Sequence, residues 1–210
     1  MSHLPRPSDF GAAGLFDDLR TGTPPPLGGG APLLLFVCTA NISRSPYAEL
    51  LTRRALGTGS PWVVASAGVP GTTGRPMDPQ MSPQAQRRGV PSRWCQAHRS
   101  RPVSRDLLTR AWLVIAMEKR QRDAVLDIAP SVHARLLTLH QVVVAAASLG
   151  VSPGWDAESL VAALFRRKPV VSSRDDVPDP YRQAPEVVER ACTVLDKGVG
   201  TLTGLLRLTA

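Results

Sequence analysis

The sequence predicts an α/β fold of a single domain, with a four-stranded parallel sheet and helices on both faces. Four apolar runs of strand length alternate along the chain with segments of helical patterning, an order typical of parallel strands joined by right-handed connections. The length of 210 residues suits one core with tails better than two domains. We therefore expect one domain over residues 33–210, preceded by a leader over residues 1–32.

The first predicted strand, at 33–37, is a continuous apolar run, as expected for a strand that is buried on both faces of a sheet. The other strands are predicted at 62–65, 112–116 and 135–139, and the one at 112–116 is expected to be buried. Helices are predicted at 45–56, 79–88, 118–126 and 184–206. The last helix carries apolar residues at helical spacing, which indicates that it covers one face of the sheet.

Two segments lie outside this alternation. The leader is rich in proline and glycine and lacks the apolar centre of a secretory signal, so we expect a flexible segment that could include a short helix at 10–19. Residues 140–176 are predicted to contain two helices, at 141–149 and 157–167, and to form an insertion. Two interpretations of this insertion stay open: its helices border the functional site and select the substrate or dock a partner, or they are a peripheral addition.

Composition narrows the classes of function. The cysteines Cys38, Cys95 and Cys192 are odd in number and far apart, which argues against a disulfide framework or a metal site and favours the cytoplasm as compartment. A net charge of +8 favours anionic substrates, but the arginines are scattered, so we expect no specific nucleic-acid partner. No apolar run approaches the ~18 residues of a membrane span, so we expect no membrane partner. The sequence does not indicate an oligomeric state.

The segment between the first strand and the first helix predicts a phosphate-binding loop, with the sequence Cys38-Thr39-Ala40-Asn41-Ile42-Ser43-Arg44-Ser45. In open parallel sheets, ligands bind where the carboxyl ends of strands turn into helices. If the loop curls around an anion, its backbone N–H groups and the helix N-terminus bind a phosphate. The same field stabilises the thiolate of Cys38, which is therefore the candidate nucleophile. Arg44 follows after five intervening residues and can grip two phosphate oxygens.

Supporting roles follow from the residue types around this loop. Ser45 is expected to cap the helix, with Pro46 in its first turn, and to hydrogen-bond the Cys38 sulfur. Asn41 is suited to a positive φ. A leaving oxygen needs a proton, and Asp179, between two prolines, is the candidate acid, with Asp176 as the alternative. An Asp-Pro turn without a catalytic role is the competing interpretation.

These residues together resemble the low-molecular-weight protein tyrosine phosphatase family. The matching segments are Phe36 to Asn41, Arg44 to Pro46, Ser66-Ala67-Gly68, Gly74 to Pro79, His98-Arg99-Ser100 and Asp179-Pro180-Tyr181. The resemblance implies a metal-free and cofactor-free hydrolysis through a phosphocysteine, with a phosphorylated protein, phosphotyrosine above all, or another anionic phosphomonoester as substrate. It implies that Cys38 is the nucleophile, Arg44 the phosphate ligand and Asp179 the general acid and base. It also implies a substrate-binding set of Thr39, Ala40, Asn41, Ile42, Ser43, Ser45 and Tyr181.

The sequence departs from the family pattern at several places. Ala40 replaces the usual glycine, and Ser43 replaces a frequent second cysteine that can protect the nucleophile from over-oxidation. Where many tyrosine-directed members have an aromatic side chain, residues 71–73 are Gly-Thr-Thr, which leaves the preference for phosphotyrosine open. Two rival functions stay open: a thiol-coupled arsenate reductase that would use Cys95, and a catalytically silent phosphoprotein-binding module. His98 and His140 are assigned no chemistry.

Overall fold

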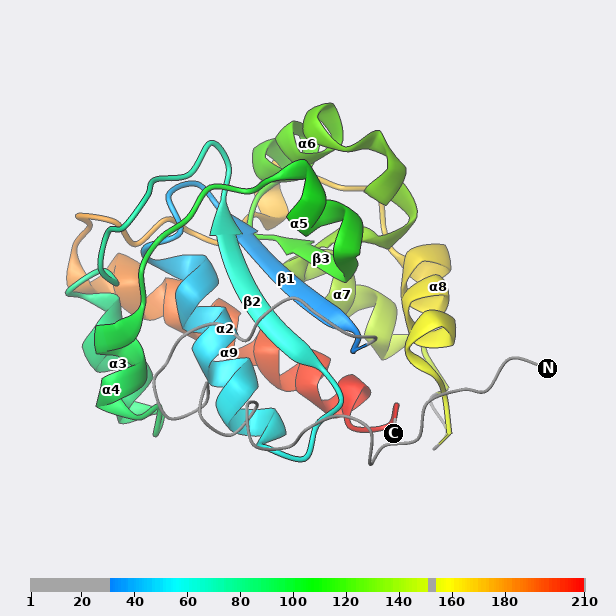
Figure 1. Cartoon of the computed structure of the whole chain (residues 1–210), viewed down its shortest axis with the longest axis horizontal. Helices are drawn as coiled ribbons and strands as arrows, with labels where there is room; N and C mark the ends of the chain where they lie inside the picture. The colour runs from blue at the N-terminus through cyan, green and yellow to red at the C-terminus, as the bar shows by residue number, and fades with distance from the viewer. Residues whose placement is uncertain (1–30, 151–153, 210) are drawn as a thin grey trace.

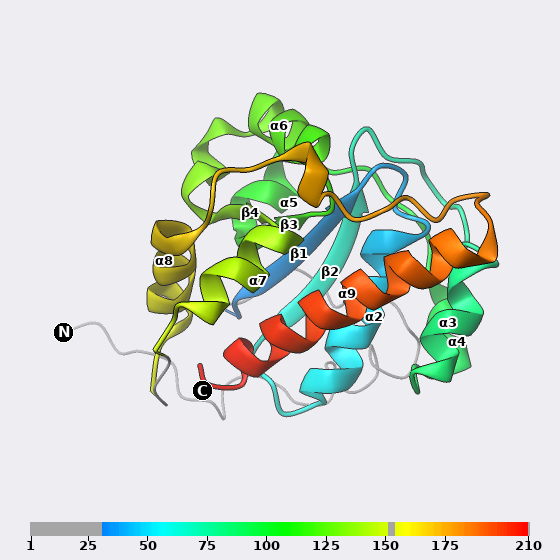
Figure 2. The same ribbon diagram turned by 180° about the vertical axis from the view of Figure 1, so that it is seen from behind.

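Four parallel strands, in the order β2-β1-β3-β4, form the centre of the computed structural model, which describes residues 31–150 and 154–209 (Figures 1 and 2). The strands are β1 (Leu33–Cys38), β2 (Val63–Gly68), β3 (Ala111–Ala116) and β4 (Leu136–Thr138). All three neighbouring pairs run parallel, as predicted. The predicted helix at 10–19 lies outside the described residues.

Helices cover both faces of this sheet, as predicted (Figures 1 and 2). One face packs against α2 (Arg44–Leu56), α7 (Leu139–Ala147) and α9 (Pro185–Leu206), with α3 (Met81–Arg87) and α4 (Ser92–Ala97) beside α2. The other face packs against α5 (Arg105–Arg110), α6 (Lys119–Ile128) and the 3₁₀ helix η2 (Pro130–Arg135). The remaining elements are α8 (Ala157–Arg167) and the short 3₁₀ turn η3 (Ser173–Asp175).

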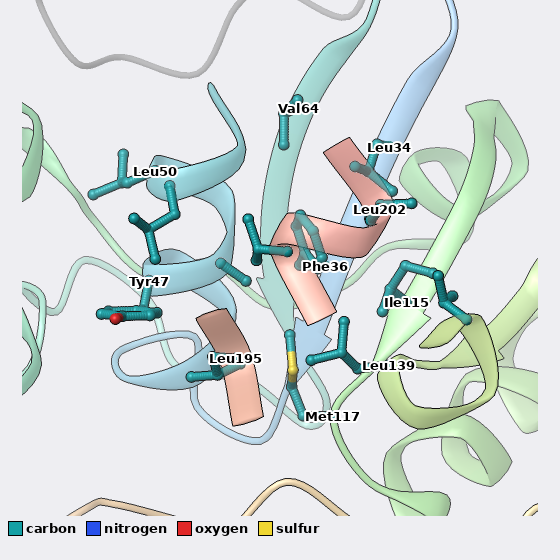
Figure 3. Packing of buried hydrophobic residues seen from close by; sticks show 14 of the residues in the cluster. Leu34, Phe36, Tyr47, Leu50, Val64, Ile115, Met117, Leu139, Leu195 and Leu202 are labelled. Atoms are coloured by element: carbon teal, nitrogen blue, oxygen red, sulfur yellow. The ribbon is translucent and has the colours of Figure 1, made fainter. Parts of the chain in front are cut away.

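The alternation of side chains along β1 divides the core into two clusters. Leu34 and Phe36 face the α2 and α9 side, where Leu202 of α9 packs close to them (Figure 3), whereas Leu35 and Val37 face the α5 and α6 side. Both sets are fully buried. A strand buried on both faces fixes its own carboxyl end firmly, and that end is where the chain turns into α2.

Some predictions about individual elements were wrong. Trp112 is 40% exposed, because the register between β1 and β3 shifts there and leaves Trp112 without a partner on β1. The fourth strand ends at Thr138, because Thr138 caps α7 by accepting a hydrogen bond from the N–H of Gln141. The six-residue helices α4 and α5 were not predicted, because they are too short to show a helical period.

The segment 140–176 contains all of α7 except its first residue, together with α8 and η3, and α8 has the predicted bounds. Figures 1 and 2 show α8 beside α7 and apart from the loop that follows β1. Leu160 and Leu164 of α8 are buried in the core cluster on this side of the sheet, and both the insertion and its role stay predictions. Within residues 31–150 and 154–209, no helix is both long enough and apolar enough to cross a bilayer.

Candidate active site

The loop between β1 and α2 has its carbonyl groups fixed on its outer side. The carbonyl oxygens of residues 38–42 accept hydrogen bonds, in chain order, from Val69 N–H (2.8 Å), Gly71 N–H (2.9 Å), Thr72 Oγ1 (2.8 Å), His98 Nε2 (2.8 Å) and Asp78 N–H (2.9 Å). A trans peptide directs its N–H opposite to its carbonyl, so the amides of residues 39–43 point to the inner side. In the described part of the chain, these amides donate to no protein acceptor. The loop therefore presents a row of free donors, which suits an anion.

Asn41 holds the shape of this loop. Its φ of 56° lies in the left-handed region, as the sequence predicted. Its side-chain Nδ2 donates to Ser45 Oγ at 3.0 Å and to Ser66 Oγ at 2.8 Å, while its Oδ1 accepts from the N–H of Arg101 at 2.9 Å. One buried side chain thus ties the loop to the start of α2, to β2 and to the segment before α5.

Cys38 ends β1 and is 3% exposed. Its Sγ lies 3.0 Å from Ser45 Oγ. Because Asn41 already donates to Ser45 Oγ, the Ser45 proton is directed to the sulfur or to the Ala67 carbonyl, which is farther away at 3.3 Å. The predicted contact between Ser45 and the sulfur is therefore present.

The prediction that Ser45 caps α2 was wrong. The helix begins at Arg44, so the N-cap position falls on Ser43, and Ser45 lies within the first turn. Ser43 makes no cap with its side chain either, because its hydroxyl donates to the Asp78 carboxylate at 2.9 Å. Polar contacts with distant residues have replaced local capping at this helix start.

Arg44 is 1% exposed, and its guanidinium is held from two sides. Nη1 donates to the Glu118 carboxylate and to the carbonyl oxygen of Val177 (2.9 Å), and Nη2 lies 3.1 Å from Oδ2 of Asp179. Among the described residues, the buried Nε of Arg44 has no hydrogen-bond partner. A buried donor of a cation without a partner is unusual, and it suits a site that receives an anionic oxygen.

Glu118 was not predicted as a site residue. It lies two residues after the end of β3 and is 7% exposed, and its carboxylate contacts both Arg44 and Arg120. Burial opposes its ionisation, but the hydrogen bonds and charges of Arg120 and Arg44 outweigh burial and hold the pKa of this carboxyl below its ordinary value. The sequence contained a signal for this role, because residues at the carboxyl end of a parallel strand face the ligand site.

The loop of residues 176–181 brings the predicted acid to the same place. The N–H of Val177 donates to the Met117 carbonyl at 2.9 Å, which attaches this loop to the end of β3. The side chain of Asp179 contacts Arg44, but it is still 44% exposed to solvent. Asp176, the alternative acid, instead accepts from the N–H of Lys119 at 2.7 Å at the start of α6, and burial raises its pKa.

The family model of the low molecular weight phosphotyrosine protein phosphatases matches residues 33–153. The chain belongs to this family. Among its curated relatives, the phosphatase Wzb of Salmonella typhi is 27% identical over 164 residues, which cover 78% of this chain and 87% of Wzb. The phosphatase Etp of Escherichia coli K12 is 28% identical over 165 residues, with 78% and 87% coverage.

Solved structures agree with the fold. The tyrosine phosphatase AmsI of Erwinia amylovora superposes with a TM-score of 0.61 at 24% identity, over 85% of this chain and 95% of AmsI. The arginine phosphatase YwlE of Geobacillus stearothermophilus superposes with a TM-score of 0.62 at 24% identity, over 84% and 93%. The predictions of the fold class, of the family and of its class of enzyme, a phosphoric monoester hydrolase, are confirmed.

The phosphatase loop thus has most of the predicted site residues within one constellation. Ser45 connects Cys38 and Asn41 through hydrogen bonds. Asp179, which is distant in the sequence, contacts the same loop through Arg44. Thr39 and Ala40 are half-buried, whereas Ile42 and Ser43 are buried and offer the inner side only their amides. Tyr181 lies farther out, where its Oη accepts from Nη2 of Arg75 at 3.3 Å.

The other two cysteines of this phosphatase interact with residues outside the loop. The thiol of Cys95 hydrogen-bonds Ser82, and the thiol of Cys192 hydrogen-bonds Tyr47. Burial raises the pKa of both thiols. Neither forms a disulfide, and neither Ser82 nor Tyr47 belongs to the loop.

Proposed function

We propose that this phosphatase hydrolyses phosphomonoesters through a phosphocysteine on Cys38, with Arg44 as phosphate ligand and Asp179 as general acid and base. The observation that carries the proposal is the row of outward carbonyls, because it leaves five inward amides (residues 39–43) beside the sulfur. Free amides, a helix N-terminus and a buried guanidinium form a site for a dianion without a metal.

In the first step, the Cys38 thiolate attacks phosphorus and the bond to the leaving oxygen breaks. Asp179 gives its proton to that oxygen, which departs as an alcohol or phenol. The amides and Arg44 bind the equatorial oxygens, whose charge they stabilise most in the transition state. Arg44 moves no proton in this step. Its Nε–H is free to donate to a phosphate oxygen while Nη2 contacts Asp179.

In the second step, water attacks the phosphorus of phosphocysteine and the sulfur–phosphorus bond breaks. Asp179, now a carboxylate, takes the proton from that water. The electron pair returns to the Cys38 sulfur, and the Ser45 hydroxyl, 3.0 Å away, stabilises the departing thiolate. Inorganic phosphate then leaves, and the enzyme has its initial protonation state again.

The proposed substrate is a phosphotyrosine in a protein. The relatives Wzb and Etp are named protein tyrosine phosphatases, and Tyr181 supplies an aromatic side chain close to the acid loop even though residues 71–73 do not. The site residues need no cofactor for the two steps above. The three unpaired cysteines support a reducing compartment, and we propose the cytoplasm.

The experiment compares aryl phosphate hydrolysis by the wild type, Cys38→Ser and Asp179→Ala, with Asp127→Ala as a control that removes an exposed carboxylate on α6. We expect no turnover by Cys38→Ser, slowed turnover by Asp179→Ala that worsens with poor leaving groups, and wild-type rates for Asp127→Ala. Arsenate reduction is assayed in parallel with Cys95→Ser. Reduction that requires Cys95 would favour the reductase, and phosphate binding without any hydrolysis by the wild type would favour the silent module.

A further inference from the structure

Two exposed arginines contact Tyr181, the last residue of the acid loop (residues 176–181). The guanidinium of Arg75 lies 5.8 Å from the centre of the Tyr181 ring and donates to its Oη at 3.3 Å. The guanidinium of Arg182 lies 5.1 Å from the same centre. The hydrogen bond from Arg75 and the charge of Arg182 lower the pKa of the Tyr181 phenol. Three side chains from two distant segments thus form one cationic cluster.

Arg75 is attached to the phosphate loop through a chain of hydrogen bonds. Thr72 Oγ1 donates to the Ala40 carbonyl at 2.8 Å and lies 3.0 Å from Ser100 Oγ. Ser100 Oγ in turn accepts from the N–H of Arg75 at 3.0 Å, and the N–H of Ser100 donates to the Arg75 carbonyl at 2.8 Å. The backbone of Arg75 therefore has a fixed position relative to the loop that binds the phosphate.

Arg182 is fixed relative to the acid. The N–H of Tyr181 donates to Oδ1 of Asp179 at 3.2 Å, and Arg182 follows with a φ of 57°. The next residue, Gln183, donates its N–H to the Pro180 carbonyl at 3.1 Å and accepts from the Gln80 side chain at 3.0 Å. These contacts fix the backbone of the turn. Arg182, three residues after Asp179 in the sequence, therefore has a fixed backbone position relative to the proton donor.

No carboxylate of residues 31–150 or 154–209 forms a salt bridge with this cluster. In the described residues, neither Arg75 nor Arg182 forms an ion pair. The carboxylates of the site, Glu118 and Asp179, both contact Arg44 instead. A substrate that places its phosphate in the loop therefore meets two unpaired cations beside Tyr181.

We propose that Arg75 and Arg182 select phosphopeptides that carry carboxylate side chains next to the phosphorylated residue. The inference rests on the proposed phosphatase function and adds a substrate class to it. Residues that flank a phosphotyrosine lie outside the loop once its phosphate is bound, which is where the two guanidinium groups are. Exposed charge pairs each change affinity only severalfold and are screened by salt, so the selection is a preference that weakens with ionic strength.

The test uses the full chain and two phosphotyrosine peptides that differ only in glutamate or glutamine on both sides of the phosphotyrosine. We expect a kcat/KM about fivefold to tenfold higher for the glutamate peptide with the wild type at low salt. The double variant Arg75→Gln/Arg182→Gln is expected to reduce this ratio to about 1–2. Arg167→Gln, which removes the same charge from the exposed end of α8, is expected to keep the wild-type ratio.

The possible results distinguish failure of this substrate selection from failure of the proposed phosphatase activity. Equal kcat/KM values of the wild type for both peptides would overturn the selection while leaving the phosphatase intact. A preference that survives in the double variant would also overturn it, because other residues would then be responsible. Absence of turnover of both peptides and of an aryl phosphate would refute the phosphatase function itself.

Discussion

Replacing Glu118 with glutamine tests how the phosphate-binding guanidinium is positioned. The glutamine keeps one oxygen that can accept from Nη1 of Arg44, but it removes the charge and places an amide NH₂ against Arg44 or Arg120. Val177 and Asp179 still contact the guanidinium, so Arg44 is weakened in its position rather than released. We expect slower catalysis by a protein that still folds.

The expected magnitude follows from the contacts. The bond from Arg44 to the glutamine oxygen stays charge-assisted, because the guanidinium is still charged, but the attraction between two opposite charges is lost. The cost is therefore expected to be about 1–2 kcal/mol, which is less than the ~3–5 kcal/mol of a fully broken buried pair. If about 2 kcal/mol is lost from the transition state, kcat/KM falls about thirtyfold.

The assay measures kcat/KM for an aryl phosphate and the urea-unfolding free energy of the same samples. Glu158→Gln, an exposed glutamate on α8, is the matched control and is expected to behave as the wild type. Because the folded pKa of Glu118 lies below its ordinary value, its stabilisation is complete above about pH 4.3 and is lost as the pH falls through the folded pKa. The stability deficit of the variant should therefore shrink in acid. A kcat/KM within twofold of the wild type would refute this account of Glu118.

Three further predictions concern single residues around the loop. Ser45→Ala should slow alkylation of Cys38 by iodoacetamide at neutral pH about tenfold, through loss of the 3.0 Å contact with the sulfur; equal rates would contradict this. Burial lowers the pKa of His98, so the unfolded chain binds more protons, and stability should fall as the pH drops below about 6.5. Urea unfolding at several pH values should show that the unfolding free energy of His98→Gln decreases less with falling pH than that of the wild type. The same decrease in both proteins would contradict this prediction. Gly71→Ala should lower the unfolding free energy by about 2 kcal/mol or more, since Gly71 has φ +84° and a Cβ there would lie 2.5 Å from Pro102 Cα. Gly74→Ala is its control, with φ +73° and open space, and should cost clearly less in the same thermal or urea unfolding.

The part of the site that the sequence predicted is the part that is local in the chain. Cys38 ends a buried strand, Asn41 lies in the loop and Arg44 begins a helix, and that order alone predicts a loop that binds an anion. The positive φ of Asn41 follows from its side chain. Asp179 was harder to assign, because an Asp-Pro turn occurs without catalysis and only the fold brings it to Arg44.

The residues that the sequence did not reveal are partners from distant segments. The carbonyl contacts of Thr72 and His98 and the ion pair of Glu118 depend on the packing of other elements around β1. The wrong assignment of Ser45 as a helix cap has the same origin, because a capping serine and a serine that contacts a thiol have the same local sequence. Tertiary contacts decided between the two roles.

Trapping the covalent intermediate tests the central claim most directly. In Asp179→Ala, an aryl phosphate with a good leaving group depends little on the acid in the first step, whereas hydrolysis of the intermediate lacks its base, so phosphoenzyme should accumulate. Rapid quenching followed by mass spectrometry of the peptides is expected to find one phosphoryl group on the peptide that contains Cys38. Turnover with no phosphoryl group on Cys38, or with one on a different residue, would contradict the account.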